Sequence, residues 1–307
     1  MIKIQSIDIE KAPIALLAIP VCEDGEIHEG SAAVLVEKAK QLKEFSGKKD
    51  EELTLYNLPG TGVERALFIG IGKCEAVDAE KLRAFAGRSV KTCIRKDIFD
   101  MVIAVPTGKK LPLEPAAAVQ SLAEGACLAN HVFDKYKKDK KHKALKQILL
   151  CLNSESPKPF VPLVRRVDTI CAGTRLAREW VSTPSHDKTP DQLSKTVMSS
   201  AKKTVLKTTV WGPKELKQAK FGAMLAVAAG SQNPPRLLFL EHTPPGAKKT
   251  VVLVGKGVTF DSGGINLKPT GSLEDMKIDM SGAAAVAATL ITASKLKVKT
   301  RVVGVIP

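Results

Sequence analysis

The feature that most constrains the fold of this 307-residue chain is the segment 251–284, where an apolar run is followed by closely spaced glycines and charged side chains. The run 251–254 is typical of a buried strand, and the four glycines that follow within ten residues mark sharp turns or close backbone approaches. Lys256 and Asp261 would lie on the loop that leaves the carboxyl end of this strand, where open α/β sheets place their ligands. The segment predicts an α/β domain with a functional site on that loop.

A second carboxylate, Asp279, precedes a run of small residues at 281–286 that favours a closely packed helix. Two carboxylates that converge at a helix entrance need cations to offset their repulsion, and a divalent metal does this more completely than a lysine. Oxygen ligands together with an amine suit Zn, Mn, Co or Mg. A helix-capping aspartate beside solvated loop charges accounts for the same spacing. The spacing alone leaves both interpretations open.

The strings GKGVTFDSGGINLK at 255–268 and MKIDM at 276–280 resemble the leucyl aminopeptidase (cytosol aminopeptidase, M17-type) family of dinuclear metallopeptidases. The resemblance implies that Lys256 is a metal ligand and that Asp261 bridges two metal ions. It further implies that Asp279 binds one of these ions and that Lys268 is catalytic. The implied cofactors are two divalent ions, Mn or Zn, and the implied substrates are peptides with a free amino terminus, leucine being preferred.

The same resemblance extends upstream, through segments 123–137, 172–184 and 222–231. The family's second metal motif, of the form Asn-Thr-Asp-Ala-Glu-Gly-Arg, does not occur in the 307 residues. We therefore expect a chain truncated before that motif, with an incomplete catalytic domain. The resemblance also implies a homohexamer for the complete protein, and a secondary DNA-binding role is known among bacterial relatives.

Alternating strand-like and helix-like runs predict two α/β domains, the second a metallopeptidase domain with a mixed, mainly parallel sheet flanked by helices. The expected boundaries are 1–153 for an N-terminal α/β domain, 154–182 for a linker and connecting helix, and 183–307 for the catalytic domain. Strands are expected at 67–72, 101–105, 145–152, 204–211, 237–241, 251–254 and 301–306. Helices are expected at 79–86, 161–181, 213–218 and 283–295, with a further helix starting at Thr189-Pro190.

The formal net charge of +15 raises the question of a nucleic-acid partner, but the charge is uneven. Residues 1–160 hold 25 Lys and Arg against 22 Asp and Glu, whereas residues 161–307 hold 22 against 10. The densest basic run, 135–143, lies in the nearly balanced half and is typical of a solvated loop. The alternative to an enzyme is an inactive fragment or scaffold that binds DNA through its basic surface.

Cysteines and histidines form none of the spacings that would indicate another metal site. The six cysteines include no CxxC pair and several lie in apolar runs, which favours buried reduced thiols. The five histidines form no HExxH, so structural roles are favoured for His131, His186 and His242. The chain has no apolar stretch of about 18 residues and no secretory signal, so we expect a cytoplasmic protein without a membrane span.

Two other enzyme classes fit the glycine-rich segments poorly. Lys256 lacks the preceding glycine and the following Ser or Thr of a P-loop, and Gly70-Ile71-Gly72 lacks the third glycine of a dinucleotide-binding turn. Ser262 is not in the Gly-x-Ser-x-Gly setting of a serine hydrolase. The sequence therefore favours a dinuclear metal-dependent aminopeptidase that uses metal-activated water.

Overall fold

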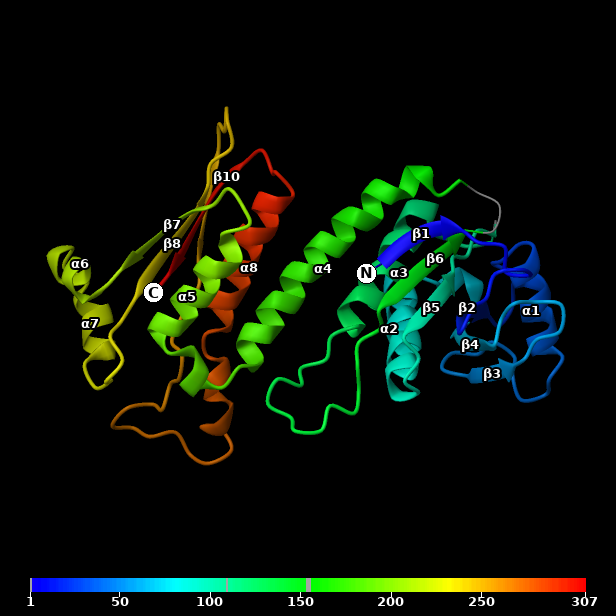
Figure 1. Cartoon of the computed structure of the whole chain (residues 1–307), viewed down its shortest axis with the longest axis horizontal. Coiled ribbons are helices and arrows are strands. Elements are labelled where there is room, and N and C mark those ends of the chain that lie inside the picture. The colour runs from blue at the N-terminus through cyan, green and yellow to red at the C-terminus, as the bar shows by residue number, and fades with distance from the viewer. Residues whose placement is uncertain (1, 109, 153–155) are drawn as a thin grey trace. The chain divides into compact units, whose positions relative to one another are not determined.

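A computed structural model describes residues 2–108, 110–152 and 156–307 as two compact units, Met1–Cys171 and Ala172–Pro307 (Figure 1). Each unit has its own sheet and its own buried core. The predicted fold class, two α/β domains, is confirmed.

The first unit is built on a six-stranded sheet with strand order β1-β6-β5-β2-β4-β3. All neighbouring strands pair in parallel except β3 and β4, which are antiparallel. The strands are β1 (Ile2–Ser6), β2 (Leu17–Cys22), β3 (Glu52–Tyr56), β4 (Arg65–Gly72), β5 (Asp100–Ala104) and β6 (Gln147–Leu152). The central strands β2 and β4 are apolar along nearly their whole length because both of their faces are covered.

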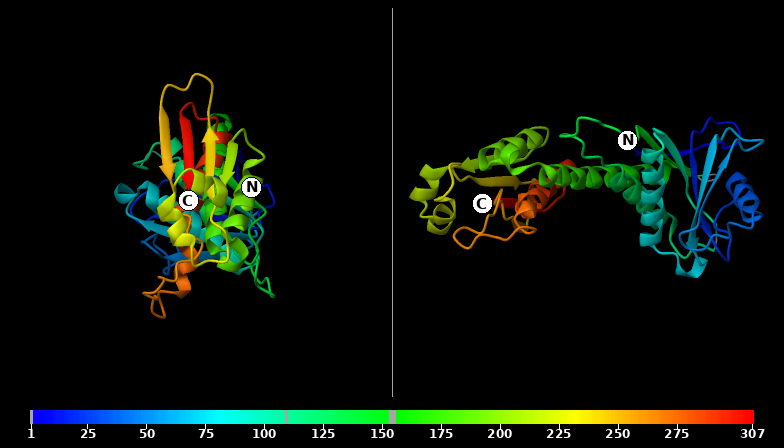
Figure 2. Two further views of the ribbon diagram at one scale, coloured as in Figure 1. Left: turned by 90° about the vertical axis from the view of Figure 1, so that its left-hand side faces the viewer. Right: turned by 90° about the horizontal axis from the view of Figure 1, so that it is seen from below.

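Helices cover the two faces of this sheet, α1 (Ser31–Lys40) on one and α2 (Ala79–Arg95) with α3 (Pro115–Ala129) on the other (Figure 2). The sequence starts α2 with a cap, because the Asp78 carboxylate accepts the Lys81 N–H at 2.8 Å. The short 3₁₀ helix η1 (Cys74–Ala76) precedes it. The basic run 135–143 lies in an exposed irregular segment, in agreement with the solvated loop predicted from the sequence.

Helix α4 (Val161–Ser182) follows the 3₁₀ helix η2 (Lys158–Phe160) and contains the division between the two units. Its first half contributes Val164, Val167 and Cys171 to the core of the first unit. Its last turns contribute Trp180 to the core of the second. The linker predicted at 154–159 falls partly on residues 153–155, which lie outside the described residues.

The second unit has a four-stranded mixed sheet with strand order β7-β8-β10-β9. The expectation that parallel pairings predominate here is corrected: among the described strands only β9 and β10 pair in parallel, whereas β8 pairs antiparallel with both β7 and β10. The strands are β7 (Lys207–Trp211), β8 (Leu237–His242), β9 (Thr250–Val254) and β10 (Arg301–Ile306). Helices α6 and α7 lie in the connection between β7 and β8, and β9 and α8 lie in the connection between β8 and β10.

Helices α5 (Pro190–Ala201) and α8 (Ser281–Lys295) bury their apolar sides in the core of the second unit. Helix α5 begins as the sequence predicts, with Thr189 and Gln192 forming a capping box and Pro190 in the first turn. Two short helices, α6 (Pro213–Gln218) and α7 (Gly222–Ala228), lie between β7 and β8. By length and composition alone, residues 274–295 could cross a membrane, but α8 belongs to this core.

Strand β9 forms where the sequence predicts a strand, but the prediction that it is buried is wrong. Val251, Val252 and Val254 are 45%, 56% and 70% exposed. The reason is position: β9 is at the edge of the sheet and β10 is its one strand neighbour in the described chain. An apolar edge strand with unpaired backbone groups is a site for association with another chain.

We therefore expect Val252→Lys to reduce concentration-dependent self-association and to change the free energy of unfolding by about 0.5 kcal/mol or less, because the side chain is already half exposed. Sedimentation velocity across a protein dilution series and urea unfolding measure the two effects. Ile306→Lys is the matched control, since Ile306 is buried in the same sheet and should lose about 3 kcal/mol or more. Self-association unchanged by Val252→Lys would contradict the account of the β9 edge.

Candidate metal centre

The sequence-predicted site residues lie on two segments that meet at the carboxyl end of β9. The first is the loop 255–268, which leaves β9, and the second is the 3₁₀ helix η4 (Glu274–Ile278) with Asp279, which leads into α8. The loop is joined to α8 by the Ala283 N–H, which donates to the Lys256 carbonyl at 2.9 Å. The loop and the helix entrance therefore meet, and together they carry the four residues predicted from the sequence to form the site.

Close backbone approach explains the glycine at the start of the loop. A Cβ atom added at Gly255 would lie 2.4 Å from the Gly282 carbonyl oxygen, a distance that real Cβ atoms do not tolerate. Gly263 is required for a different reason, because its φ of +90° lies in the left-handed region that favours glycine. Both observations confirm the turns and close approach predicted from the sequence.

The four predicted site residues form two lysine–carboxylate pairs. The Lys256 ammonium lies 2.8 Å from Asp279 Oδ1, to which it donates, and 2.7 Å from Asp279 Oδ2. The Lys268 ammonium donates to Asp261 Oδ2 at 2.9 Å and lies 2.8 Å from Met276 Sδ. Asp261 Oδ1 accepts the Gly263 N–H at 2.9 Å. Each aspartate is therefore paired with one lysine.

The lysines of both pairs affect the pKa of Asp261. Its pKa is lowered first by the hydrogen bond from Lys268, then by the Gly263 N–H, and further by the positive charges of Lys268 and Lys256. Lys256 thus acts on Asp261 while it is paired with Asp279. Asp261 remains an anion well below neutral pH, which is the state that a metal ligand needs.

Asp279 does not cap helix α8. The N-cap residue is Met280, and no side chain makes a capping hydrogen bond there. Instead Asp279 ends η4, and its Oδ2 atom is buried without a hydrogen bond, although it lies in ion-pair contact with Lys256. This geometry disfavours the capping interpretation that the sequence left open. The Lys256 ammonium already neutralises this buried oxygen at 2.7 Å, and a metal cation at the same place would do the same.

The types and contacts of these side chains decide whether they could hold a divalent metal. In the described ranges, no group of three or more His, Cys, Asp or Glu side chains gathers at any point, so a metal here would need the Lys256 amine beside the two carboxylates. The Asp261 and Asp279 carboxylates could supply oxygen ligands, and Lys256 contacts Asp279 while its positive charge lowers the pKa of Asp261. The residues fit one divalent ion of the kind that takes oxygen ligands with an amine.

The three histidines predicted to be structural differ in burial, since His186 is exposed and His131 is partly exposed. His242 is buried, and its Nε2 lies 2.8 Å from the Val298 carbonyl oxygen. The six cysteines are free and buried. They lie in cores and form no cluster with the candidate metal ligands.

Two residues near the centre were not predicted from the sequence, and both lie on the 3₁₀ helix η3 (Ser185–Lys188). The Ser185 hydroxyl donates to the Thr259 carbonyl at 2.9 Å. Lys188 is 3% exposed, and its ammonium donates to the carbonyls of Trp180 and Val181 at 3.0 and 2.9 Å. No signal in the sequence distinguishes Lys188 from the many exposed lysines of the chain.

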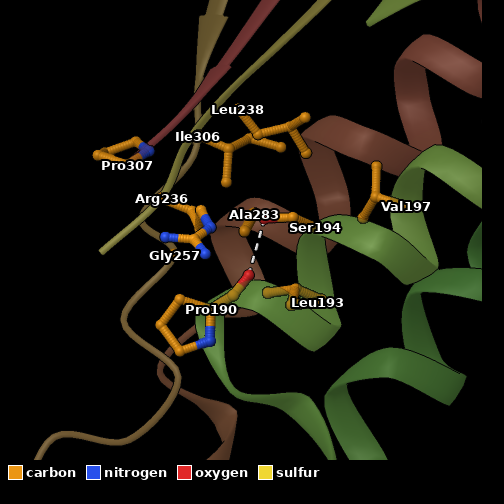
Figure 3. Close-up of a pocket in the computed structure, with 10 residues that line it drawn as sticks. All are labelled: Pro190, Leu193, Ser194, Val197, Arg236, Leu238, Gly257, Ala283, Ile306 and Pro307. Carbon is orange, nitrogen blue, oxygen red and sulfur yellow. Dashed lines mark hydrogen bonds between the residues drawn. The ribbon is translucent and has the colours of Figure 1, made fainter. Parts of the chain in front are cut away.

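An apolar pocket lies behind the loop, lined by residues of α5, β8 and β10 (Figure 3). Its polar groups are satisfied: the Ser194 hydroxyl donates to the Pro190 carbonyl at 2.7 Å, and Arg236 pairs with Asp191 at 3.1 Å. Gly257 is the one loop residue in its wall. The four predicted site residues do not line it, so it is no part of the candidate centre.

Two family models match the chain. The model described as the catalytic domain of the cytosol aminopeptidase family matches residues 175–307, and the one described as the N-terminal domain of the same family matches residues 20–140. Together they include both units of the structure.

Curated relatives are similar over most of the chain. A probable cytosol aminopeptidase of a Geobacter species is 36% identical over 93% of this chain and 58% of its own length. A probable cytosol aminopeptidase of Desulfovibrio desulfuricans is 32% identical over 99% of this chain and 63% of its own length. The chain thus spans about three fifths of the length of these relatives.

Solved structures share the fold. The bottromycin maturation enzyme BotP in complex with Mn has a TM-score of 0.80 at 27% identity, over 96% of this chain and 59% of its own. A variant of tomato leucine aminopeptidase has a TM-score of 0.82 at 24% identity, over 99% of this chain and 61% of its own, a likeness in fold alone.

Burial of Lys188 generates a pH-dependent prediction. Burial, and secondarily the positive charge of Lys277, lower the pKa of Lys188 from 10.5 to about 8. Between these two pH values the unfolded chain holds the proton that the folded chain has released, so this group makes the fold more stable as pH rises. The free energy of unfolding of the wild type minus that of Lys188→Met should therefore increase from about pH 7.5 to about pH 10.

Urea unfolding at a series of pH values measures this difference. Lys195→Met is the matched control on the neighbouring helix, because the Lys195 side chain is 75% exposed. A difference for Lys188→Met that is flat with pH, or that falls as pH rises, would show that burial does not disfavour the Lys188 charge.

Proposed function

The chain belongs to the cytosol aminopeptidase family, and from that membership we propose that it forms the amino-terminal and metal-binding part of an aminopeptidase that releases N-terminal residues from peptides. The observation that carries the proposal is the contact of Lys256 with both oxygens of Asp279, together with the Asp261 carboxylate, whose pKa is lowered by Lys268 and by the charge of Lys256. Carboxylate oxygens together with an amine are ligands that suit divalent ions such as Mn and Zn. The names of the relatives support a cytosolic protein.

The proposed cofactor is a pair of divalent ions, Mn or Zn, which would polarise the scissile carbonyl and activate water for attack. Mn in the BotP complex supports this identity. Asp261 and Asp279 would hold the cations as carboxylates, and Lys256 would bind as a neutral amine once a cation replaces its ammonium beside Asp279. The described donors suffice for one ion, so a second ion needs ligands from elsewhere.

Lys268 has a different task. Its ammonium lies 2.9 Å from the Asp261 carboxylate, and we assign it the task of directing a positive charge at the substrate. A charge placed where the carbonyl oxygen becomes negative stabilises that oxygen more in the transition state than in the ground state. We therefore assign Lys268 to the reacting carbonyl and Lys256 to the metal. Leucine preference and a homohexamer are further parts of the proposal, and both rest on the family resemblance of the segment 255–280.

DNA binding is the weaker alternative. Two lysines of the exposed basic run 135–143 make contacts within their own loop. Lys140 lies 4.0 Å from Asp134, and Lys135 lies over the Tyr136 ring at 5.1 Å. No observation in the described residues favours a nucleic acid over solvent there, so we propose no second function.

The two lysines should separate in a metal-binding experiment. We expect Lys256→Met to weaken Mn²⁺ binding, because it removes one donor. Lys268→Met should leave Mn²⁺ binding nearly intact and lower kcat of the active protein about 10²–10³-fold, as for the loss of one oxyanion donor. Isothermal titration with Mn²⁺ and leucine-p-nitroanilide hydrolysis measure the two effects. Equal losses of metal and turnover in both variants would contradict the assignment of separate roles.

The second test concerns the missing ligands. Since the described residues supply donors for one ion, we expect this chain to turn over leucine-p-nitroanilide far more slowly than the same chain extended with the carboxyl-terminal two fifths of the Geobacter relative. Both proteins are assayed side by side with Mn²⁺ or Zn²⁺. An extended chain carrying Asp261→Asn controls for activity that does not depend on the centre. Comparable turnover by the unextended chain would show that these three donors suffice.

A further inference from the structure

We propose that η3 is the positioning segment of the metal centre, with Ser185 and Lys188 setting the placement of the two segments that carry Asp261 and Asp279. The inference rests on the proposed function, since it concerns the same site. Ser185 and Lys188 are three residues apart, yet each contacts a different metal-binding segment. They do not touch the reacting atoms, so their role is positional.

Ser185 holds the Asp261 loop. Its hydroxyl donates to the Thr259 carbonyl, two residues before Asp261. In the described chain this is the one hydrogen bond that ties residues 257–262 to another element, because the other bonds of that stretch are made within the loop itself. Without it, the loop between Lys256 and Asp261 would be held by packing alone.

Lys188 holds the entrance of α8. Its ammonium lies 3.4 Å from the sulfur of Met280, which follows Asp279 and is fully buried. The same ammonium satisfies the Trp180 and Val181 carbonyls in the last turn of α4, where helix carbonyls lack intrahelical donors. One buried cation therefore fixes the end of α4 against the residue next to Asp279.

Hydrogen bonds hold the residues on both sides of η3 in place, so η3 can position the segments that contact it. On its carboxyl side, Thr189 is locked by the capping box with Gln192. On its amino side, the Thr183 hydroxyl donates to the Glu179 carbonyl at 2.9 Å. Because η3 is fixed at both ends, a shift of either metal-binding segment would have to break a contact to it. Partners that orient metal ligands in this way commonly change metal affinity about 10–100-fold.

The test is hydrogen–deuterium exchange of the metal-free 307-residue chain, followed by mass spectrometry. Ser185→Ala should speed exchange in peptides covering 257–268 about fivefold, the loss expected for one hydrogen bond. Ser185→Thr should restore the wild-type rate. Ser200→Ala is the matched control, because the Ser200 hydroxyl donates to a carbonyl within α5, away from the centre. Lys188→Met should speed exchange in peptides covering 276–283, with Lys195→Met as its control.

Mn²⁺ titration of the same variants is the second readout, and Ser185→Ala should weaken binding about tenfold. Unchanged exchange in 257–268 for Ser185→Ala would overturn the proposal. If Lys188→Met fails to fold, Ser185→Ala alone decides the test. Asp279→Asn tests the proposed metal centre separately from the positioning role of η3. If it binds Mn²⁺ as well as wild type, the proposed metal centre is wrong, whereas the exchange rates still decide whether η3 positions these segments.

Discussion

The candidate metal centre depends on one contact between two backbone segments, where the loop leaving β9 packs against the first turn of α8. Gly255 is tight against the Gly282 carbonyl, and the Ala283 N–H is bonded to the Lys256 carbonyl. This contact brings Lys256 within reach of Asp279, which is 23 residues away in sequence. Once the two segments meet, Lys256 contacts Asp279 and its positive charge also lowers the pKa of Asp261.

Lysine contacts offset the negative charge of both aspartates. Two aspartates near one another are costly unless cations offset their repulsion, and here each has a lysine within 2.9 Å. Both oxygens of Asp279 lie within 2.8 Å of the Lys256 ammonium. A divalent ion bound to Asp279 would take over the role of Lys256 as counter-ion.

Local sequence patterns predicted much of this arrangement. The glycines around Lys256 indicated close approach, and Thr189 with Gln192 indicated a helix start, because these signals depend on backbone geometry and neighbouring residues. The choice between a capping aspartate and a metal ligand at 279 could not be made from spacing, since it depends on which residue takes the N-cap position. That residue is Met280.

Properties that arise from tertiary contacts were not predictable. The valines of β9 are as apolar as those of a central strand, and their exposure follows from edge position in a sheet whose antiparallel pairings come from distant segments. The burial of Lys188 depends on the end of α4 meeting Met280, a contact between residues 92 positions apart. Neither fact leaves a periodic or local signal.

The central claim is that Lys256, Asp261 and Asp279 surround a cation site. The most direct measurement is an anomalous difference map from crystals of the chain soaked with Mn²⁺. We predict a peak within roughly 2.0–2.6 Å of carboxylate oxygens of Asp261 and Asp279, the range of hard divalent cations with oxygen ligands, and displacement of the Lys256 ammonium from its pairing with Asp279. A map with Mn²⁺ bound elsewhere, and Lys256 still paired with Asp279 at saturating Mn²⁺, would contradict the claim.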